Sequence, residues 1–515
     1  MTDECENAVR LDQRNVRSCT TLAVWKIALV TAALHLVLAG RYDVFRNELY
    51  FIVCGRHPAF GYVDQPPLVP LLAAATQLFG DNIWMLRLPS VVAAAALPLV
   101  AAALARLLGG GTISVLLAAA AVALAPALTG FTATLTTSTF EPVAWTVCAY
   151  LLTRSVVCDD RRAILWAGVA AGLAMEAKYG VAMWLIGLAI GIVATPARRV
   201  LWWPQCWIAA ALAILLAAPS LAWQTTHDWP FFSAVFQPAV AGRPYLGTPL
   251  KFAIWQIIAL NPLLSPFWIA GWVAPFLLDR LRSVRFLSIA AVVAAVIDYS
   301  GGGKDYYLFP LYPTLMAVGA VALGRIPRTA ATIWLAAAFA LSATMAPAVL
   351  PILEPTILAR YLDMTRLRPP PNEAAAVGAP LTQVFSDEVG WRDLEQQVAA
   401  VYRSLSEDER RQAVIIASNY GEAAAIDVYG RSDGLPPALS GENQYFLWGT
   451  HGFDGDIVIH INGDPQRWRK LCKSVETAAN FGVVYAMPYE NGRPIFVCQG
   501  LLTPIAKIWP RFKRY

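Results

Sequence analysis

The segment from Arg41 to Asn82 holds the densest group of polar side chains that could carry out chemistry. Asn47 and Glu48 stand next to each other in it, and Asp64 follows shortly before two prolines. A carboxylate in such a segment can take the proton from a hydroxyl or an amine while that group attacks a carbon atom. If Glu48 is this base, its change to glutamine should abolish the reaction while the protein is still expressed.

Arg56 and His57 follow these acids closely. A cation can bind a phosphate and stabilise the charge that develops when the phosphate leaves. We therefore expect Arg56 to contact a phosphate, and we expect His57 and Asn47 to line the substrate. The same pattern also allows a simpler interpretation, in which Glu48 pairs with Arg46 or Arg56 in a solvated loop.

A second isolated carboxylate, Glu141, follows the uncharged window 107–140. An acid at this position can simply favour the N-terminus of a helix, and Pro142 suits the first turn of a helix. The alternative is a catalytic role for Glu141. The residues alone leave both interpretations open.

Each of two lysines is the only cation of its outer segment. Lys178 follows an apolar stretch, and Lys304 lies in the run GGGKDYYLFPLYP with Tyr306 and Tyr307. Either lysine is a reasonable phosphate ligand, and the tyrosines can line a sugar or a lipid. The simpler interpretation is a lysine that reaches the membrane surface and an aromatic belt at that surface.

A weaker polar group, His227-Asp228-Trp229, follows a later apolar window.

Together, the stronger segments supply two separated carboxylates, two lysines and several aromatic rings. That inventory suits the transfer of a glycosyl group from a lipid phosphate, with an acid as base and cations at the leaving phosphate.

The elements that must position these residues are membrane helices. The chain has 515 residues, of which 57% are hydrophobic and 15% charged, whereas soluble proteins carry about 25% charged residues. Long windows contain no acidic residue, lysine or arginine, and a helix needs about 20 apolar residues to cross a bilayer. We predict about 11 transmembrane helices, at roughly 21–40, 83–106, 112–129, 140–157, 163–177, 180–196, 200–223, 250–278, 285–298, 306–323 and 329–350. The span 250–278 contains Asn261-Pro262, so we expect it to be kinked or broken.

The charges between these spans predict an orientation. Surplus arginines lie at alternate connections, around residues 10–17, 106, 154–162, 198–199, 280–285 and 325–328. Cytoplasmic loops carry such an excess. The remaining connections, 41–82, 134–139, 175–179, 224–248 and 298–307, carry isolated acids, single lysines, histidine and aromatic residues. The polar chemistry therefore gathers on the non-cytoplasmic face, where 11 spans also place the C-terminal region.

The C-terminal region is predicted to be a separate domain. Of the 35 acidic residues, 19 lie between Glu354 and Glu490, and prolines at 369–371 open the region. We divide the chain into a membrane domain at 1–353 and a small C-terminal α/β domain at 354–515. Its predicted helices are 391–404, 421–429 and 464–473, and its predicted strands are 413–418, 457–461, 483–487 and 494–498. Cys472 and Cys498 can pair if the compartment is oxidising.

In these motifs the sequence resembles glycosyltransferase family 39, a broad group of protein O-mannosyltransferases, aminoarabinose transferases and rhizobial galacturonosyl transferases. The matching pieces run in order from about Gly40 to Pro313: FRNELYF, GYVDQPPLVPLL, DNIWMLRLPS, STFEPVAW, GLAMEAKYG and GGGKDYYLFPLYP. ASNYGEAAAIDVYG and GENQYFLWG in the tail resemble the C-terminal part of a bacterial branch. Gln65 stands where the aminoarabinose transferases carry a lysine.

The resemblance implies a GT-C fold, an active site on the outer side and a polyprenyl-phosphate sugar as donor. An acidic pair in the first outer loop of the family usually supplies the base, but here Asn47 replaces the first acid and Glu48 keeps the second. Either Glu48 or Asp64 then takes the role, or the enzyme is altered or inactive. Glu141 matches the second loop acid, which assists the base or holds a divalent metal; no other cofactor is implied. Lys178 matches the lysine near the donor phosphate, and Lys304 can act likewise.

The predicted function is therefore a membrane glycosyltransferase that moves a sugar to a lipid, polysaccharide or protein of the cell envelope. The resemblance implies the bacterial inner membrane, with the active site and the tail in the periplasm. Nucleic acid is not an expected partner. Two alternatives stay open. A transporter or flippase would need polar groups near the bilayer midplane, and among the predicted spans only 250–278 provides them. A catalytically degenerate member would explain Asn47.

Overall fold

The computed structural model describes residues 2–234, 248–370 and 376–515. The chain forms two compact units. The first comprises residues 1–39, 87–219 and 244–352, and the second comprises 40–86, 220–243 and 353–515. Parts of two segments named above, 224–248 and the prolines at 369–371, lie outside the described residues. The first outer segment, 41–82, belongs to the second unit together with the C-terminal region.

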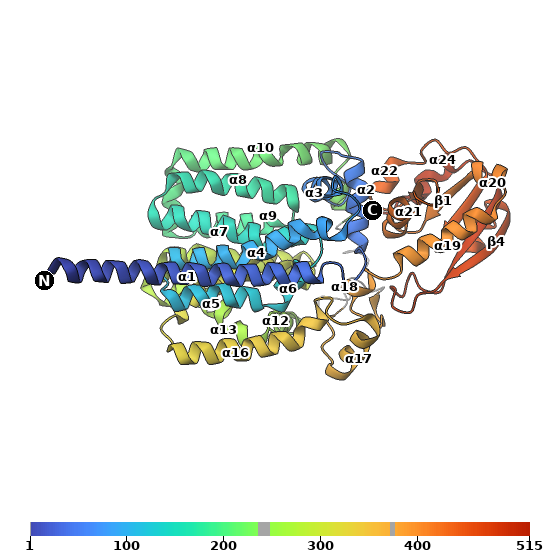
Figure 1. The fold of residues 1–515 in the computed structure, drawn as a ribbon. Helices are drawn as coiled ribbons and strands as arrows, with labels where there is room; N and C mark the ends of the chain where they lie inside the picture. Colours follow the sequence, from blue (N-terminus) through green and yellow to red (C-terminus); the bar gives the residue numbers. More distant parts are fainter. Residues whose placement is uncertain (1, 235–247, 371–375) are drawn as a thin grey trace. The chain divides into compact units, whose positions relative to one another are not determined.

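The first unit is built from helices, and Figure 1 shows many of them side by side with their axes aligned. In chain order they are α1 (Thr2–Leu38), α4 (Ile83–Leu107), α5 (Thr112–Leu124), α6 (Pro126–Phe131), α7 (Glu141–Cys158), α8 (Arg161–Ala177), α9 (Val181–Val193), α10 (Pro204–Thr226), α12 (Pro249–Ala259), α13 (Ser265–Leu277), α14 (Arg285–Ser300), α15 (Tyr312–Leu323) and α16 (Arg328–Met345). The first residues of α4 and about the last two turns of α10 extend into the second unit.

Glycines let several of these helices approach closely. A Cβ atom on Gly271 of α13 would lie 1.8 Å from the carbonyl oxygen of Leu315, and one on Gly319 of α15 would lie 1.7 Å from that of Phe267. Gly187 and Gly191 of α9 approach the backbone of α14 in the same way. Small residues at helix contacts are typical of membrane bundles, because backbone packing replaces the hydrophobic effect between helices in lipid.

Every predicted span coincides with a helix or a pair of helices, but the helices differ in length and polarity. Among the described residues, five helices are long and apolar enough to cross a membrane, and up to seven if each bent pair counts as one span. The predicted spans at 112–129, 140–157, 163–177 and 285–298 are α5, α7, α8 and α14. These four are shorter or less apolar than that standard.

The predicted break in span 250–278 is confirmed. α12 and α13 meet at an angle of 92°, and Asn261 between them adopts a φ of 72°. The buried Asn261 side chain donates to the carbonyl oxygen of Ala338 and to Ser342, and it accepts from the backbone N–H of Leu263. The Asn261 side chain thus caps the backbone N–H of Leu263 at the break and ties the break to α16. The break therefore has a structural cause, and it gives the transport hypothesis no support.

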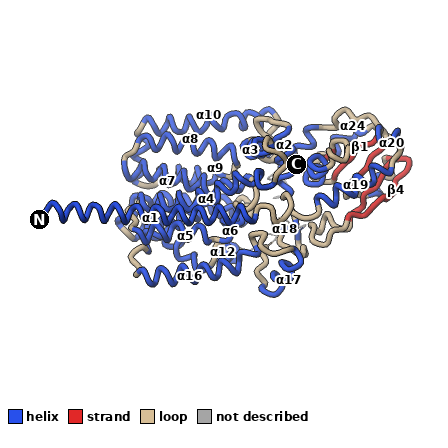
Figure 2. Tube along the Cα trace, in the orientation of Figure 1, coloured by secondary structure: helices blue, strands red, loops and turns tan. Residues whose placement is uncertain are grey.

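The second unit contains the strands, which Figure 2 shows in red. Its helices are α2 (Arg46–Arg56), α3 (Leu68–Gln77), α17 (Pro355–Thr365), α18 (Gln383–Ser386), α19 (Trp391–Ser404), α20 (Glu407–Arg411), α21 (Tyr420–Tyr429), α22 (Gln444–Trp448), α23 (Pro465–Trp468) and α24 (Ile505–Ile508). Its strands are β1 (Ala413–Ala417), β2 (Ala438–Ser440), β3 (Ile457–Ile461), β4 (Cys472–Phe481) and β5 (Arg493–Leu501). The sheet order is β2-β1-β3-β5-β4, with β1 parallel to β2 and β3, and β5 antiparallel to β3 and β4.

Two predicted elements of the C-terminal region are wrong. The predicted helix 464–473 is only the short α23, and the predicted strand 483–487 lies in the connection after β4. The missed strand β4 is at the edge of the sheet, and most of its residues are at least partly exposed. An edge strand with two solvated faces lacks the apolar alternation by which strands are predicted.

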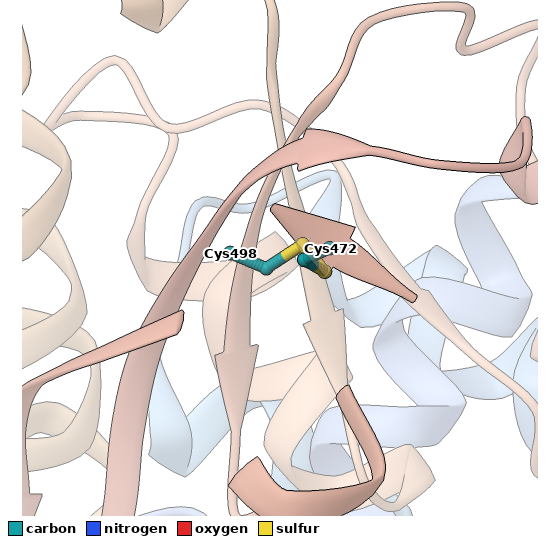
Figure 3. Close-up of a disulfide and its surroundings, with 2 residues drawn as sticks. All are labelled: Cys472 and Cys498. Carbon is teal, nitrogen blue, oxygen red and sulfur yellow. A yellow bond between two sulfur atoms is a disulfide. The ribbon is translucent and has the colours of Figure 1, made fainter. Parts of the chain in front are cut away.

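A disulfide joins Cys472 of β4 to Cys498 of β5 (Figure 3). The predicted pairing is therefore confirmed. Both cysteines are buried beside Val475, Phe496 and Ile505 in the core that covers one face of the sheet. The bridge ties the exposed edge strand to its neighbour.

Candidate functional site

Lys178 is the centre of a polar cluster in the first unit. It follows the last residue of α8, and its ammonium lies 2.6 Å from Oε2 of Glu141, the first residue of α7. The same ammonium donates to Oγ of Ser138 at 2.9 Å. Glu141 is buried, whereas the Lys178 side chain is 19% exposed. An acid at a helix N-terminus with proline in the first turn forms where the sequence predicts it, but here it also holds a lysine.

Aromatic rings complete this cluster. The 3-10 helix Asp305–Leu311 carries Tyr306 and Tyr307, and the Lys178 ammonium lies 4.7 Å from the centre of the Tyr307 ring and 5.9 Å from that of Tyr306. Lys304 lies 5.8 Å from the Tyr306 ring. A cation over an aromatic face is attracted by the ring quadrupole. The structure thus brings four predicted residues, Glu141, Lys178, Tyr306 and Tyr307, into one cluster, and Lys304 also lies near the Tyr306 ring.

At two glycines near these residues there is little or no space for a side chain. A Cβ atom on Gly180 would lie 3.0 Å from Oε1 of Glu141, and one on Gly303 would lie 1.6 Å from Oδ1 of Asp298. The second distance leaves no room for any side chain. In the GGGKDYY run, Gly303 is therefore needed for close packing, and it directly precedes Lys304.

In the second unit, Glu48 has a structural position. Its side chain is fully buried, and Oε2 accepts a hydrogen bond of 2.9 Å from the backbone N–H of Phe45, the residue before α2. Such a bond satisfies one of the backbone donors that a helix N-terminus leaves without a partner. Glu48 therefore fixes the start of α2.

The neighbours of Glu48 contact the C-terminal part of the same unit. Asn47 accepts a hydrogen bond of 2.8 Å from the hydroxyl of Tyr420. Arg46 lies 3.6 Å from Asp387, donates to the hydroxyl of Tyr489 and stacks against Tyr420. The polar run at the start of α2 thus binds the tail domain, which explains its density of polar side chains without a catalytic role for each.

Asp64 has the properties of a proton acceptor. Its carboxylate accepts from the hydroxyl of Tyr50 at 2.9 Å and from the side-chain amide of Asn443 at 3.2 Å, and the residue is only partly buried. Desolvation raises the pKa of Asp64 to about 6, whereas the bond from Tyr50 lowers it and the nearby Glu442 raises it. A carboxylate whose pKa lies near neutrality is well suited to general base catalysis.

Arg56 and His57 each contact a residue of the C-terminal region. Arg56 donates to the carbonyl oxygen of Asp427 at 2.9 Å and lies 4.0 Å from Asp81. The ring of His57 lies 4.9 Å from that of Trp448. Desolvation, followed by the nearby cations, lowers the pKa of His57. These contacts give both residues a role within the second unit.

A metal role for Glu141 does not fit the residues present. Within the described ranges, no group of three or more histidine, cysteine, aspartate or glutamate side chains is placed to hold a metal ion. The Lys178 ammonium also occupies one oxygen of Glu141, and a divalent cation would have to displace it. The charge of Glu141 is thus balanced by a lysine.

Sequence reasoning missed Ser138, Tyr50 and Asn443 as partners of the predicted residues. Tyr50 lies in FRNELYF and Asn443 in GENQYFLWG, so both fall in motifs that carry the family resemblance. Motif membership was the available signal, but Asn443 is 379 residues from Asp64 along the chain. No local pattern connects residues at that separation.

Comparisons with known proteins agree with this architecture. Residues 64–223 match the family model for dolichyl-phosphate-mannose-protein mannosyltransferase, and no curated protein sequence matches the chain. Two solved structures of ArnT from Cupriavidus metallidurans are similar. The apo structure gives a TM-score of 0.59 at 13% identity and covers 93% of this chain and 98% of that chain. The structure bound to undecaprenyl phosphate gives 0.55 at 12% identity and covers 92% and 97%.

The chain is therefore a multi-pass membrane protein with the GT-C glycosyltransferase fold, which it shares with ArnT over nearly the whole length of both proteins. This confirms the predicted fold class, a helical membrane protein with a small C-terminal α/β domain. Over residues 64–223, less than half of the chain, the match confirms the predicted resemblance to glycosyltransferase family 39. The matched range contains Asp64, Glu141 and Lys178.

Proposed function

We propose that the protein transfers a sugar from a polyprenyl-phosphate donor to an acceptor of the cell envelope. The observation that carries this proposal is the Lys178 ammonium, held by Glu141 and Ser138 beside two tyrosine rings on a GT-C fold. ArnT, which has this fold, was crystallised with undecaprenyl phosphate. We infer the same class of lipid phosphate for this chain.

Lys178 binds the donor phosphate in this proposal. An ammonium has three N–H groups, and Glu141 and Ser138 accept from two of them. The third can donate to a phosphate oxygen. When the bond between the sugar C1 and the phosphate oxygen breaks, the electron pair stays on the phosphate, and the fixed cation stabilises that charge. Glu141 keeps the ammonium in place, and Tyr306 and Tyr307 line the sugar or the lipid.

Asp64 is the proposed base. It removes the proton from the acceptor hydroxyl or amine as that atom forms its new bond to the sugar C1. Between the two carboxylates that the sequence left open, Asp64 is partly exposed and has a pKa of about 6, whereas Glu48 is buried and caps α2. A base must reach its substrate proton. Asn47 in place of a family acid is then no obstacle to activity.

The proposed location is the bacterial inner membrane, with the second unit in the periplasm. The arginine distribution supports this orientation. The disulfide between Cys472 and Cys498 supports it too, because such bonds persist in oxidising compartments.

The test uses the full-length protein, purified and reconstituted with a panel of polyprenyl-phosphate sugars and cell-envelope acceptors. Wild type and Asp64→Asn are compared for sugar transfer. We expect turnover of one donor, and a loss of about 10²- to 10⁴-fold in Asp64→Asn, the usual contribution of a general base. Arg360→Gln, a change at an exposed residue of α17 outside the proposed site, is the control. Absence of turnover and of binding for every donor, in folded protein, would refute the proposal.

A further inference from the structure

A polar pocket in the second unit lies outside the residues discussed so far. It has a volume of about 290 Å³ and combines the segment after α10 with the last residues of the chain. Its polar lining residues are Thr226, His227, Asp228, Ser233, Lys513 and Tyr515. The weak sequence motif His227-Asp228-Trp229 thus forms one wall of a pocket whose other wall comes from nearly 300 residues further along the chain.

The pocket is at the end of a membrane span. α10 is a candidate span that ends at Thr226, so the residues that follow emerge at the membrane surface. Exposed aromatic side chains accompany them: Trp229 is 39% exposed and Phe232 is 47% exposed. Tryptophan and other aromatic residues are enriched at the level of the lipid headgroups. A ligand in this pocket is therefore a molecule found at that level.

The pocket holds opposite charges that do not neutralise each other. Among the described residues, no ion pair joins Asp228 to Lys513, although both line the pocket, where Tyr515 also lies near Asp228. The Lys513 ammonium lies 4.4 Å from the Tyr515 ring centre. An anion alone would meet the Asp228 carboxylate, and a cation alone would meet the Lys513 ammonium. A ligand with both charges a few bonds apart satisfies both residues.

His227 is fixed beside these charges. Its ring stacks on that of Trp223 with centres 4.0 Å apart. Its Nδ1 lies 2.8 Å from the carbonyl oxygen of Trp223 and 3.1 Å from Oγ1 of Thr226. These contacts hold the ring and engage Nδ1, so Nε2 stays available to a ligand. An imidazole Nε2 can donate to or accept from a ligand, depending on the tautomer.

We propose that this pocket binds the phosphoethanolamine headgroup of a membrane phospholipid. Lys513 and the hydroxyl groups of Ser233 and Tyr515 donate to the phosphate, and Asp228 accepts from the ammonium. The inference is independent of the proposed glycosyl transfer, because it uses none of the residues assigned to that reaction.

Native mass spectrometry of the full-length, delipidated protein in detergent tests the proposal. The ligands are short-chain phosphatidylethanolamine, phosphatidylglycerol and phosphatidylcholine, with soluble phosphoethanolamine and inorganic phosphate as headgroup controls. We expect wild type to bind phosphatidylethanolamine roughly tenfold more tightly than phosphatidylglycerol, a difference of about 1.4 kcal/mol. Equal binding of the two lipids would overturn the proposal. Inorganic phosphate bound as well as the lipid would reduce the site to an anion site and overturn it as well.

Two variants separate the charges. Asp228→Asn keeps the size of the side chain, and we expect it to bring the two lipids close to equal affinity. Lys513→Met is expected to weaken the binding of both lipids. Lys507→Met, at an exposed lysine on α24 outside the pocket, is the matched control and should bind as wild type does. If Asp228→Asn leaves the lipid preference unchanged in folded protein, Asp228 does not receive the ammonium and the proposal fails.

Discussion

The hydroxyl of Tyr50 donates a hydrogen bond of 2.9 Å to Oδ1 of Asp64. This bond stabilises the ionised carboxylate and so opposes the desolvation that raises the pKa of Asp64 to about 6. Tyr50 is itself buried, and the nearby Asp64 adds to the desolvation that raises the pKa of its hydroxyl. Tyr50 therefore stays protonated and acts as a fixed donor, which makes it a positioning residue for the proposed base.

This relationship predicts a pH profile. The base must be deprotonated to act, so transfer should be present above the pKa of Asp64 and fall as the pH decreases through about 6. Tyr50→Phe removes the bond that lowers this pKa, so the acid limb should move to higher pH. The rate of transfer as a function of pH measures both effects. Tyr361→Phe, at a partly exposed tyrosine of α17, should keep the wild-type profile. An acid limb that does not move in Tyr50→Phe would exclude the positioning role.

Lys178 should be sensitive to the loss of its charge. Lys178→Met removes the proposed phosphate ligand, and we expect transfer to fall about 10²- to 10³-fold, as when a stabilising donor is removed from other active sites. Single-turnover kinetics with the identified donor measure the effect.

The single change also leaves Glu141 buried without its partner, which destabilises the fold. The double variant Lys178→Met/Glu141→Gln removes both charges and controls for that loss. Lys251→Met, at an exposed lysine of α12, should be fully active. Normal donor turnover by the folded double variant would show that Lys178 does not bind the phosphate.

Glu48 should tolerate glutamine. The side-chain oxygen of glutamine can accept the same hydrogen bond from the N–H of Phe45, because glutamate and glutamine both serve at this capping position. We expect Glu48→Gln to keep most of the transfer activity, and Glu48→Ala to lower stability by about 1 kcal/mol through loss of the cap. Thermal unfolding and transfer assays on the two variants measure this. A folded but inactive Glu48→Gln would make Glu48, rather than Asp64, the base.

The disulfide should stabilise the second unit. The two cysteines are separated by 26 residues, and closing a loop of this size contributes roughly 3 kcal/mol. Cys472→Ser should lower the unfolding temperature of the oxidised protein, whereas Cys158→Ser, at an exposed free cysteine, should not. Labelling with a thiol reagent before reduction checks the pairing in cells. Full reactivity of Cys472 at that stage would contradict both the bond and the proposed compartment.

The sequence predicted the regular elements better than the contacts between them. α19 and β3 begin and end as predicted, because an amphipathic helix and a buried apolar strand have strong periodicity. Asn261-Pro262 predicted the broken span, since proline removes a helix hydrogen bond. By contrast, β4 is solvated at the sheet edge and was missed.

The site shows the same division. The sequence singles out Glu141 as an isolated acid and Lys178 as a lone cation, but it does not show them as a pair, because residue 141 begins α7 and residue 178 follows the end of α8. The sequence shows that residue 48 is a glutamate, but it does not show that the side chain is buried. A glutamate that caps a helix and one that acts as a base therefore cannot be distinguished from the sequence.

The second unit is assembled from segments that are far apart in the chain, so they are synthesised at different times. The segment 40–86 emerges early, but its partners lie in 353–515, and Tyr420, which bonds to Asn47, follows it by 373 residues. At a synthesis rate of about 5–20 residues per second, α2 waits for roughly 20–75 seconds before that partner exists. Throughout this interval the apolar face of the nascent loop must be kept from aggregating, so membrane insertion factors or chaperones have a long window in which to act on it.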